Sequence, residues 1–215
     1  IKQFKPKIIV NLAWEGIPNY SSKMLNKNLK DQKIFLSKIK NIKSVQKIIM
    51  TGTCLEYENM SYPYKEDKKF KPHSLFPVIK LKLRKYLFDI FKNIEVTWLI
   101  LFYVYGKGQK KKSLIPYARE QIKKNKVLNI KNLNQKNDYI HVSDVISIIY
   151  KNIIKQNGDG GVFNVGTGKS TSNQEILNML IKKYNKNYNK MNYKNNKKDN
   201  QIIVANLSKI KQLYK

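Results

Sequence analysis

Short runs of apolar, β-branched residues alternate with longer segments of helical periodicity in the first half of the chain. The runs at 5–13, 45–50 and 96–104 predict buried strands. The segments near 22–42 and 74–92 repeat apolar residues at helical spacing and predict helices. Because strands that alternate with helices are typical of βαβ units, the pattern predicts an α/β fold with a parallel sheet.

Beyond Gly108 the pattern is looser and predicts a smaller α/β lobe. Its expected elements are helices near 113–125, 142–155 and 173–184, strands at 127–130 and 161–165, and a closing strand and helix within 201–213. Residues 182–200 contain only Lys, Asn, Tyr, Met and Asp. This composition buries too little apolar surface to offset the entropy of ordering, so the segment is predicted to be a mobile, low-complexity loop.

A formal net charge of +29, from 43 basic and 14 acidic residues, is a reason to consider nucleic acid or an anionic membrane as a partner. Only Arg84 and Arg119 are arginine, however, and most phosphate- and base-reading surfaces use the planar guanidinium fork. The lysines are spread over the whole chain beside abundant Asn, Ile and Tyr, and these residue types share AT-rich codons. We therefore attribute the charge to compositional drift and do not expect a nucleic-acid partner, although lysine-driven nucleic-acid binding remains a third hypothesis.

The sequence contains no apolar run long enough to span a bilayer and no basic-then-apolar signal segment. With Cys54 as the single cysteine, an internal disulfide is excluded, which fits a reducing compartment. We expect a cytoplasmic protein without a membrane span.

Several short motifs follow one another in a specific order along nearly the whole chain. They are NLAWEGIPNY (11–20), MTGTCLEYE (50–58), PHSLFPVIK (72–80), LFYVYGKGQ (101–109), NDYIHVSDV (137–145) and GVFNVGTGKSTS (161–172). In this order and spacing they resemble the NAD-dependent epimerase/dehydratase family of extended short-chain dehydrogenases/reductases. The first two motifs are most similar to those of 4-ketoreductases of nucleotide-linked 6-deoxysugars.

The resemblance implies a partial Rossmann-type sheet with a separate substrate-binding lobe. Residues 1–105 would form the C-terminal half of a dinucleotide-binding domain, and residues 106–215 would form the lobe. The implied reaction is hydride transfer between NAD or NADP and a carbon of a nucleotide-sugar substrate, for the synthesis of surface polysaccharide. Family members commonly dimerise through the helices that match 22–42 and 74–92, so a homodimer is expected by analogy.

The family places a Ser/Thr hydroxyl, a tyrosine and a lysine around the reacting sugar oxygen. The matching positions are Thr53, Phe76 and Lys80. A spacing of four puts the last two on one helix face, but the phenyl ring of Phe76 has no proton to exchange, so the central acid/base is absent. From the residues alone, Thr53 also fits a residue that caps its own turn, and Lys80 also fits a solvated lysine.

Further site residues are implied by the same motifs. The cofactor-binding positions are Leu12, Ala13, Thr51, Lys80 and Val104, and the substrate-binding positions are Thr53, Tyr103, Lys136 and Asn137. Asn137 stands where the family usually has a diphosphate-binding arginine, and its neighbour Lys136 offers only a point charge. Tyr103 replaces a substrate-binding asparagine, and His141 is interpreted as a structural residue.

The family's glycine-rich loop G-x-x-G-x-x-G, which holds the cofactor pyrophosphate, does not occur in the sequence. It should lie roughly 60–70 residues before the first motif. We therefore expect the first βαβ units to be missing, the apolar strand at 8–10 to be an exposed edge, and NAD(P)H to bind weakly. The leading hypothesis is a partial or impaired enzyme, and the alternative is a non-catalytic binding protein on the same scaffold.

Overall fold

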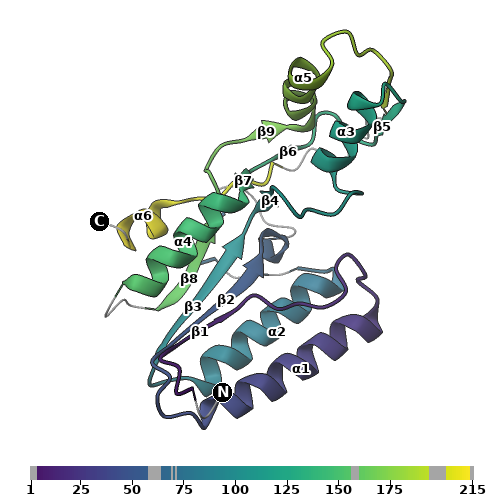
Figure 1. Cartoon of the computed structure of the whole chain (residues 1–215). Helices are drawn as coiled ribbons and strands as arrows, with labels where there is room; N and C mark the ends of the chain where they lie inside the picture. Colours follow the sequence, from purple (N-terminus) through teal and green to yellow (C-terminus); the bar gives the residue numbers. More distant parts are fainter. Residues whose placement is uncertain are drawn as a thin grey trace.

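A parallel sheet of four strands, covered by helices on both faces, forms the larger part of the molecule (Figure 1). The computed structural model describes residues 4–57, 64–68, 70, 72–155, 160–193 and 202–213. The strands are, in their order across the sheet, β1 (Ile8–Asn11), β2 (Lys47–Thr53), β3 (Glu95–Leu101) and β8 (Gly161–Val165). Because neighbouring strands run parallel, their carboxyl ends meet at one edge of the sheet.

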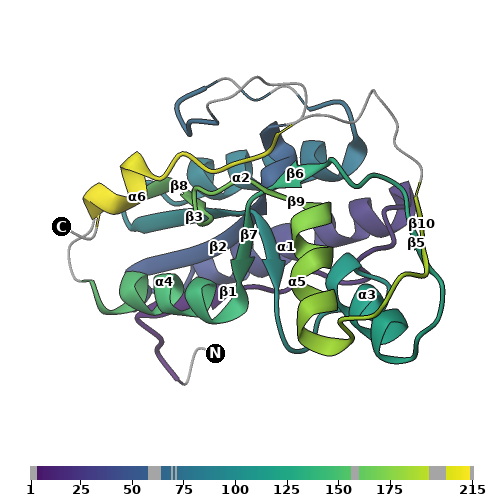
Figure 2. The same ribbon diagram turned by 90° about the horizontal axis from the view of Figure 1, so that it is seen from above.

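Two layers of helices explain why the strands are continuously apolar. On one face lie α1 (Ser22–Lys40) and α2 (Leu75–Ile90), and on the other lie α4 (Val142–Ile154) and α6 (Ser208–Leu213) (Figure 2). Successive side chains of a strand point to opposite faces. Ile48 of β2 therefore packs toward α1 and α2, while its neighbour Ile49 packs toward α4, and both are fully buried.

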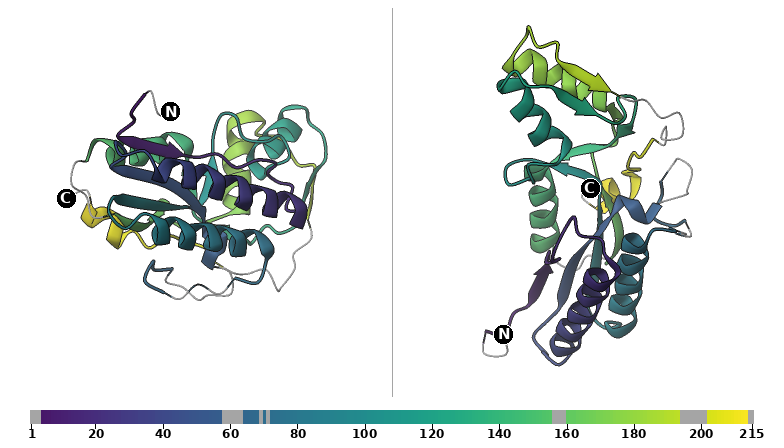
Figure 3. Two further views of the ribbon diagram at one scale, coloured as in Figure 1. Left: turned by 90° about the horizontal axis from the view of Figure 1, so that it is seen from below. Right: turned by 90° about the vertical axis from the view of Figure 1, so that its right-hand side faces the viewer.

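A small lobe stands beyond the carboxyl edge of the sheet (Figure 3). It is built from α3 (Leu114–Lys123), β5 (Leu128–Ile130), α5 (Asn173–Tyr184) and β10 (Met191–Tyr193), and β10 runs parallel to β5. Its own core includes the buried side chains of Ala118, Ile122, Leu128 and Leu177. The first turn of α5 is closed by a capping box between Ser172 and Glu175, which satisfies backbone N–H groups at the start of the helix.

Two short ladders connect the sheet with the lobe, and a short helical turn follows β2. The ladders pair β4 (Tyr103–Tyr105) with β7 (Tyr139–His141), and β6 (Lys136–Asn137) with β9 (Thr171–Ser172). The turn is the 3₁₀ helix η1 (Cys54–Tyr57), directly after β2. His141 caps the N-terminus of α4 by accepting from the backbone N–H of Ser143 at 3.3 Å, in agreement with a structural role.

The carboxylate of Asp138 joins three segments that lie far apart in the sequence. This fully buried group accepts hydrogen bonds from the backbone N–H and hydroxyl of Thr167 (2.7 and 2.6 Å), the N–H of Gly168 (2.8 Å) and the N–H of Ala205 (3.1 Å). Both oxygens are therefore saturated. A side chain at Gly166 would collide with Asp138, since a Cβ there would lie 2.4 Å from Oδ2.

Buried Lys47, the first residue of β2, binds the C-terminal end of α4 to the sheet. Its ammonium donates to the backbone carbonyls of Asn152 and Lys155, both at 2.7 Å, and forms an ion pair with Glu95 at 3.0 Å. The two carbonyls lie at the C-terminal end of the helix, where Lys155 is the C-cap residue. A cation is favourable at that end of the helix dipole.

The α/β class and most helices and strands agree with the sequence prediction, and β1 is an edge strand of the described sheet with partly buried side chains. Two expectations need correction. The strand predicted at 96–104 ends at Leu101, because the backbone of Tyr103 leaves the sheet to pair with β7. The closing strand within 201–213 is reduced to isolated bridges at Ile203 and Ala205.

The segment 182–200 is not a loop throughout, as the sequence predicted. Helix α5 continues to Tyr184, β10 follows at Met191–Tyr193, and residues 194–200 lie outside the described part. Tyr188 is buried, and its hydroxyl donates to the carbonyls of Lys126 and Lys190. The prediction failed because it counted tyrosines as solvated side chains.

The expected boundary at residue 105 also does not separate the sheet from the lobe. Strand β8 belongs to the sheet, in register with β3 from Thr97 opposite Gly161 to Leu101 opposite Val165. Among the described helices, none is long and apolar enough to cross a membrane.

The four hydrogen bonds of Asp138 predict a specific loss of stability in Asp138→Asn. An amide offers its NH₂ group where two N–H or O–H donors need an acceptor, so we expect the free energy of unfolding to fall by about 3 kcal/mol. Urea unfolding followed by circular dichroism measures this. Asp89→Asn is the matched control, because Asp89 is exposed and its pair with Lys92 is long at 3.9 Å. Like Asp138→Asn, it removes one negative charge, but it should change the free energy of unfolding by less than about 0.5 kcal/mol. Equal losses of stability in the two variants would contradict the role of Asp138.

Candidate functional site

Lys80 lies buried where the carboxyl ends of β1 and β2 meet α2. Its side chain is only 6% exposed, and its ammonium donates to the carbonyl of Thr51 at 3.0 Å. The ammonium also lies 4.0 Å from the ring centre of Trp14, a cation–π contact. Removal of water lowers the pKa of Lys80 to about 8, although the nearby carboxylate of Glu56 acts in the opposite direction. The alternative of a solvated lysine is therefore wrong.

Phe76, one helical turn before Lys80, is packed into an aromatic cluster. Its ring is 5.8 Å from Trp14 in an edge-on arrangement and 4.8 Å from Tyr20, measured between ring centres. Leu25 and Ile79 complete the buried surroundings. The position that corresponds to the family tyrosine thus stabilises packing and carries no ionisable group.

Thr53 is the last residue of β2 and has the hydrogen bonds of a turn residue. Its Oγ1 accepts from the backbone N–H of Leu55 at 3.3 Å, and its own N–H donates to Glu56 at 3.0 Å. The turn-capping role that the sequence allowed is therefore present. Since a hydroxyl that accepts one hydrogen bond still has a proton to donate, this role is compatible with binding a sugar oxygen.

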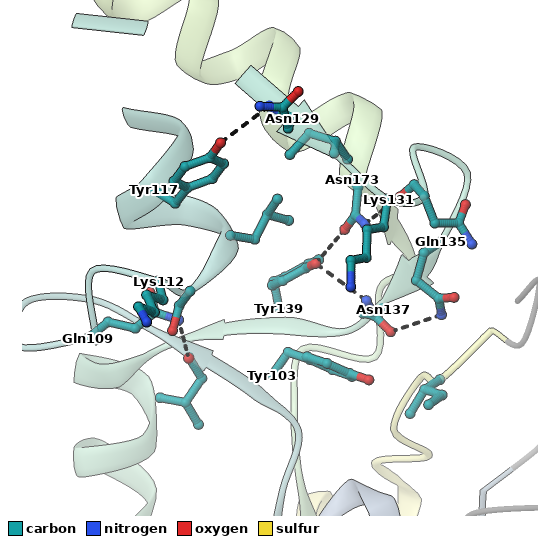
Figure 4. Close-up of a pocket in the computed structure, with 16 residues that line it drawn as sticks. Tyr103, Gln109, Lys112, Tyr117, Asn129, Lys131, Gln135, Asn137, Tyr139 and Asn173 are labelled. Carbon is teal, nitrogen blue, oxygen red and sulfur yellow. Dashed lines mark hydrogen bonds between the residues drawn. The ribbon is translucent and has the colours of Figure 1, made fainter. Parts of the chain in front are cut away.

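A cavity of about 900 Å³ opens between the connecting ladders and the small lobe (Figure 4). The polar and aromatic residues that line it include Tyr103, Tyr117, Gln109, Asn137, Tyr139 and Asn173. Its cations are Lys112 and Lys131, and Figure 4 shows the side chain of Lys131 extended into the cavity. The cavity is large enough for a nucleotide, and mixed aromatic and amide linings are typical of small-molecule sites.

A chain of hydrogen bonds orients the polar wall of the cavity. Gln135 donates to Asn137 at 3.3 Å, Asn137 to the hydroxyl of Tyr139 at 3.3 Å, and that hydroxyl to Asn173 at 2.7 Å (Figure 4). The rings of Tyr103 and Tyr139 are 5.7 Å apart. Burial raises the pKa of both phenols, so they stay protonated and serve as hydrogen-bond donors at neutral pH.

The structure brings together only part of the residues expected from the sequence. At the carboxyl ends of the sheet strands lie Thr51, Thr53, Phe76 and Lys80. The cavity is lined by Tyr103, Val104 and Asn137. Leu12 is 54% exposed, and Ala13 is also exposed with its carbonyl bonded to Gln32. Lys136 is exposed and is not among the residues that line the cavity.

Sequence reasoning missed Lys131, Tyr139 and Asn173 as cavity residues. They come from separate elements that are brought together by the pairing of β4 with β7 and of β6 with β9 and by hydrogen bonds such as that from Asn173 to the carbonyl of Asn132. Lysine is so abundant in this chain that Lys131 carries no signal by its residue type. The tyrosine was visible within the motif NDYIHVSDV, but its direction toward a cavity was not.

Side chains gathered at the carboxyl ends of parallel strands, next to a cavity in a second lobe, are the arrangement of a Rossmann-type α/β fold. The sequence matches the NAD-dependent epimerase/dehydratase family over residues 1–166. The chain belongs to this family.

Characterised relatives act on nucleotide-linked sugars according to their names. CDP-abequose synthase of Salmonella muenchen is 36% identical over 119 residues, which cover 54% of this chain and 40% of that protein. The dTDP-4-dehydro-6-deoxyglucose reductase of Escherichia coli is 26% identical over 192 residues, which cover 84% of this chain and 60% of the reductase. The chain therefore spans less than two thirds of either relative.

Solved structures with the same fold include UDP-glucuronic acid 4-epimerase of Bacillus cereus in complex with UDP-glucuronic acid and NAD. It superimposes with a TM-score of 0.85 at 23% identity, over 99% of this chain and 71% of the epimerase. UDP-glucose 4-epimerase of Thermotoga maritima, solved with UDP-glucose, gives a TM-score of 0.82 at 20% identity, over 98% of this chain and 74% of that one. At these identities the likeness establishes the fold.

The depressed pKa of Lys80 predicts how stability responds to alkaline pH. In the folded chain Lys80 loses its proton near pH 8, whereas in the unfolded chain it does so near 10.5. Between these values the unfolded state binds more protons, so the contribution of Lys80 to the free energy of unfolding rises with pH, by up to about 3 kcal/mol. Urea unfolding of wild type and Lys80→Met from pH 7 to 10.5 measures the difference. Lys82→Met corrects for the loss of one positive charge on the same helix, and parallel curves for wild type and Lys80→Met would contradict the burial effect.

Proposed function

We propose that this chain forms the substrate-binding part of an NAD(P)-dependent enzyme that modifies a nucleotide-linked sugar, as an epimerase, dehydratase or 4-ketoreductase for surface polysaccharide synthesis. The observation that carries the proposal is the buried Lys80 ammonium at the carboxyl end of β2, held by Thr51 and Trp14. Burying an ammonium is costly, and among the described residues it forms no ion pair that would compensate. A functional contact accounts for its position.

The residues present fit one end of a dinucleotide cofactor. Lys80 offers its ammonium to the nicotinamide ribose, and the loop after β1 with Leu12 and Ala13 lies beside it. The G-x-x-G-x-x-G loop is not among the 215 residues, so the pyrophosphate contacts would come from elsewhere. When bound, the nicotinamide supplies or accepts the hydride.

The side chains of this chain would position the sugar. The Thr53 hydroxyl donates a hydrogen bond to the reacting oxygen, and the Lys80 ammonium stabilises negative charge that develops there. Reduction of a carbonyl also requires a proton on that oxygen. Phe76 provides none, so proton transfer would be slow in this sequence, and we propose an impaired enzyme.

The cavity would hold the nucleotide diphosphate. Aromatic side chains such as Tyr103 and Tyr117 suit a base. Asn137 replaces the cationic arginine of the family. We assign the missing positive charge to Lys131, which lines the cavity, rather than to Lys136.

A non-catalytic binding protein is the second candidate. It is favoured by the tight packing of Phe76 against Trp14 and Tyr20, which leaves the acid/base position filled by an apolar ring. Such a protein would bind the nucleotide sugar without changing it. The expected homodimer, through the adjacent helices α1 and α2, and the cytoplasmic location remain predictions for either candidate.

The assignment of the diphosphate contact predicts that Lys131→Ala weakens binding of CDP and dTDP to this chain. Loss of a charge-assisted hydrogen bond should raise the Kd by about tenfold. Isothermal titration calorimetry measures this, with Lys136→Ala as the matched control. If Lys136→Ala weakens binding and Lys131→Ala does not, the sequence-based assignment is correct instead. Absence of any nucleotide binding at millimolar concentration would overturn the proposed function.

Restoring the phenol should distinguish an impaired enzyme from a binding protein. Joined to an N-terminal half that supplies the glycine-rich loop, the Phe76→Tyr variant is expected to reduce a 4-keto nucleotide sugar at least about a hundredfold faster than the Phe76 form, the usual scale of general acid catalysis. Oxidation of NAD(P)H, followed by absorbance, measures the rate. Phe88→Tyr adds a hydroxyl elsewhere on α2 and should change nothing. Equal rates for the Phe76 form and the Phe76→Tyr variant would mean that another group is the acid, and two inactive forms would favour the binding protein.

A further inference from the structure

A second buried charge cluster lies next to Thr53, around the carboxylate of Glu56. Glu56 in η1 has no exposed surface, and its carboxylate receives three donors. These are the backbone N–H of Thr53 at 3.0 Å, the indole N–H of Trp98 at 3.2 Å and the guanidinium of Arg84 at 2.9 Å. The carboxylate therefore bonds to groups from β2, β3 and α2.

The geometry of the cluster connects the two site residues. Arg84 follows Lys80 by four residues on α2, so both side chains lie on one face of the helix. Glu56 follows Thr53 by three residues and holds its backbone N–H. The guanidinium of Arg84 is itself fixed by stacking on the ring of Phe70, 4.2 Å from its centre. Thr53 is thus bonded to one end of the ion pair, and Lys80 lies one helical turn from the other end.

Stability alone is a poor explanation for such a pair. Burial raises the pKa of Glu56, while the Arg84 guanidinium opposes this, so the charged form is maintained only by its partners. Buried ion pairs often contribute no more stability than apolar side chains of the same size. The absence of a side chain at Gly52 leaves room for the carboxylate, because a Cβ there would lie 2.2 Å from both Glu56 and Trp98.

We propose that the Glu56–Arg84 ion pair is a positioning device that fixes the distance and orientation between the Thr53 hydroxyl and the Lys80 ammonium. Its catalytic meaning rests on the proposed function, but the coupling itself is a property of this chain. The charged group that acts on the pKa of Lys80 is Glu56 from η1, and its partner Arg84 lies on the same helix as Lys80. The groups packed nearby from the sheet and the loop after β1, which are Trp14, Thr51 and Trp98, are uncharged.

The test uses the chain in isolation and two signals that report the coupling. Lysine labelled with ¹³C at Cε gives the titration midpoint of Lys80 by NMR, with Lys80→Met to assign its signal. Amide hydrogen exchange gives the protection of the Thr53 N–H. In Glu56→Gln we expect the midpoint of Lys80 to shift below its wild-type value of about 8, because the carboxylate charge is lost. We expect the Thr53 amide to exchange about fivefold faster, because a neutral acceptor is weaker.

Two further variants keep the test decisive. Glu56→Gln combined with Arg84→Met removes both charges at similar volume, so it replaces the single variant if an unpaired Arg84 prevents folding. It should speed exchange of the Thr53 amide as the single variant does, and it should shift the Lys80 midpoint by less, because a positive charge is lost together with the negative one. Glu95→Gln breaks the other buried ion pair of the sheet, with Lys47, and should leave both signals unchanged. A pair that only stabilised the fold would lower the melting temperature of Glu56→Gln while the Thr53 amide kept its wild-type exchange rate. An unchanged Thr53 exchange rate, or an unchanged Lys80 midpoint in Glu56→Gln, would overturn the proposal.

Failure of the proposed function would look different. In that case the chain would not bind CDP or dTDP, while the Lys80 and Thr53 signals would still respond to Glu56→Gln. Conversely, normal nucleotide binding with an unchanged Lys80 midpoint would leave the function intact and exclude the positioning role.

Discussion

The saturated carboxylate of Asp138 is the interaction on which the two-part architecture depends. Its two oxygens hold the turn at Thr167 and Gly168 and the backbone of Ala205 against the residue that separates β6 from β7. The neighbours of Asp138 on either side, Asn137 and Tyr139, line the cavity. A single buried carboxylate therefore helps to set the position of the cavity wall relative to the sheet, together with the pairing of β4 with β7 and of β6 with β9.

Buried lysines have different tasks from the many exposed ones. Lys47 uses its charge at the end of α4 and is neutralised by Glu95, so its role is structural. Lys80 has a carbonyl and an aromatic face instead of a contacting carboxylate, which keeps its proton exchangeable near neutral pH. Composition alone does not reveal this difference between Lys47 and Lys80, because it depends on the surroundings of each ammonium.

The sequence predicted helices and strands best where local signals mark the same ends that packing in the folded chain requires. The expected strand 161–165 and helix 173–184 agree with β8 and α5 to the residue, since glycine precedes the former and a capping box begins the latter. The pairing of β10 with β5 was not predictable, because it joins segments about sixty residues apart that are also bridged by the bond from Tyr188 to the carbonyl of Lys126. Likewise, motif resemblance located Thr53, Phe76 and Lys80, but the partners Glu56 and Arg84 and the cavity residue Lys131 follow only from packing between elements.

Gly52 has a consequence for the evolution of this group of proteins. The space that its missing side chain leaves is occupied by the carboxylate of Glu56 and the indole of Trp98. Any larger residue at position 52 would collide with both side chains, so Gly52 can be exchanged only if Glu56 and Trp98 both give way. Substitution at Gly52 should therefore have been accepted in descent only together with changes at the other two positions.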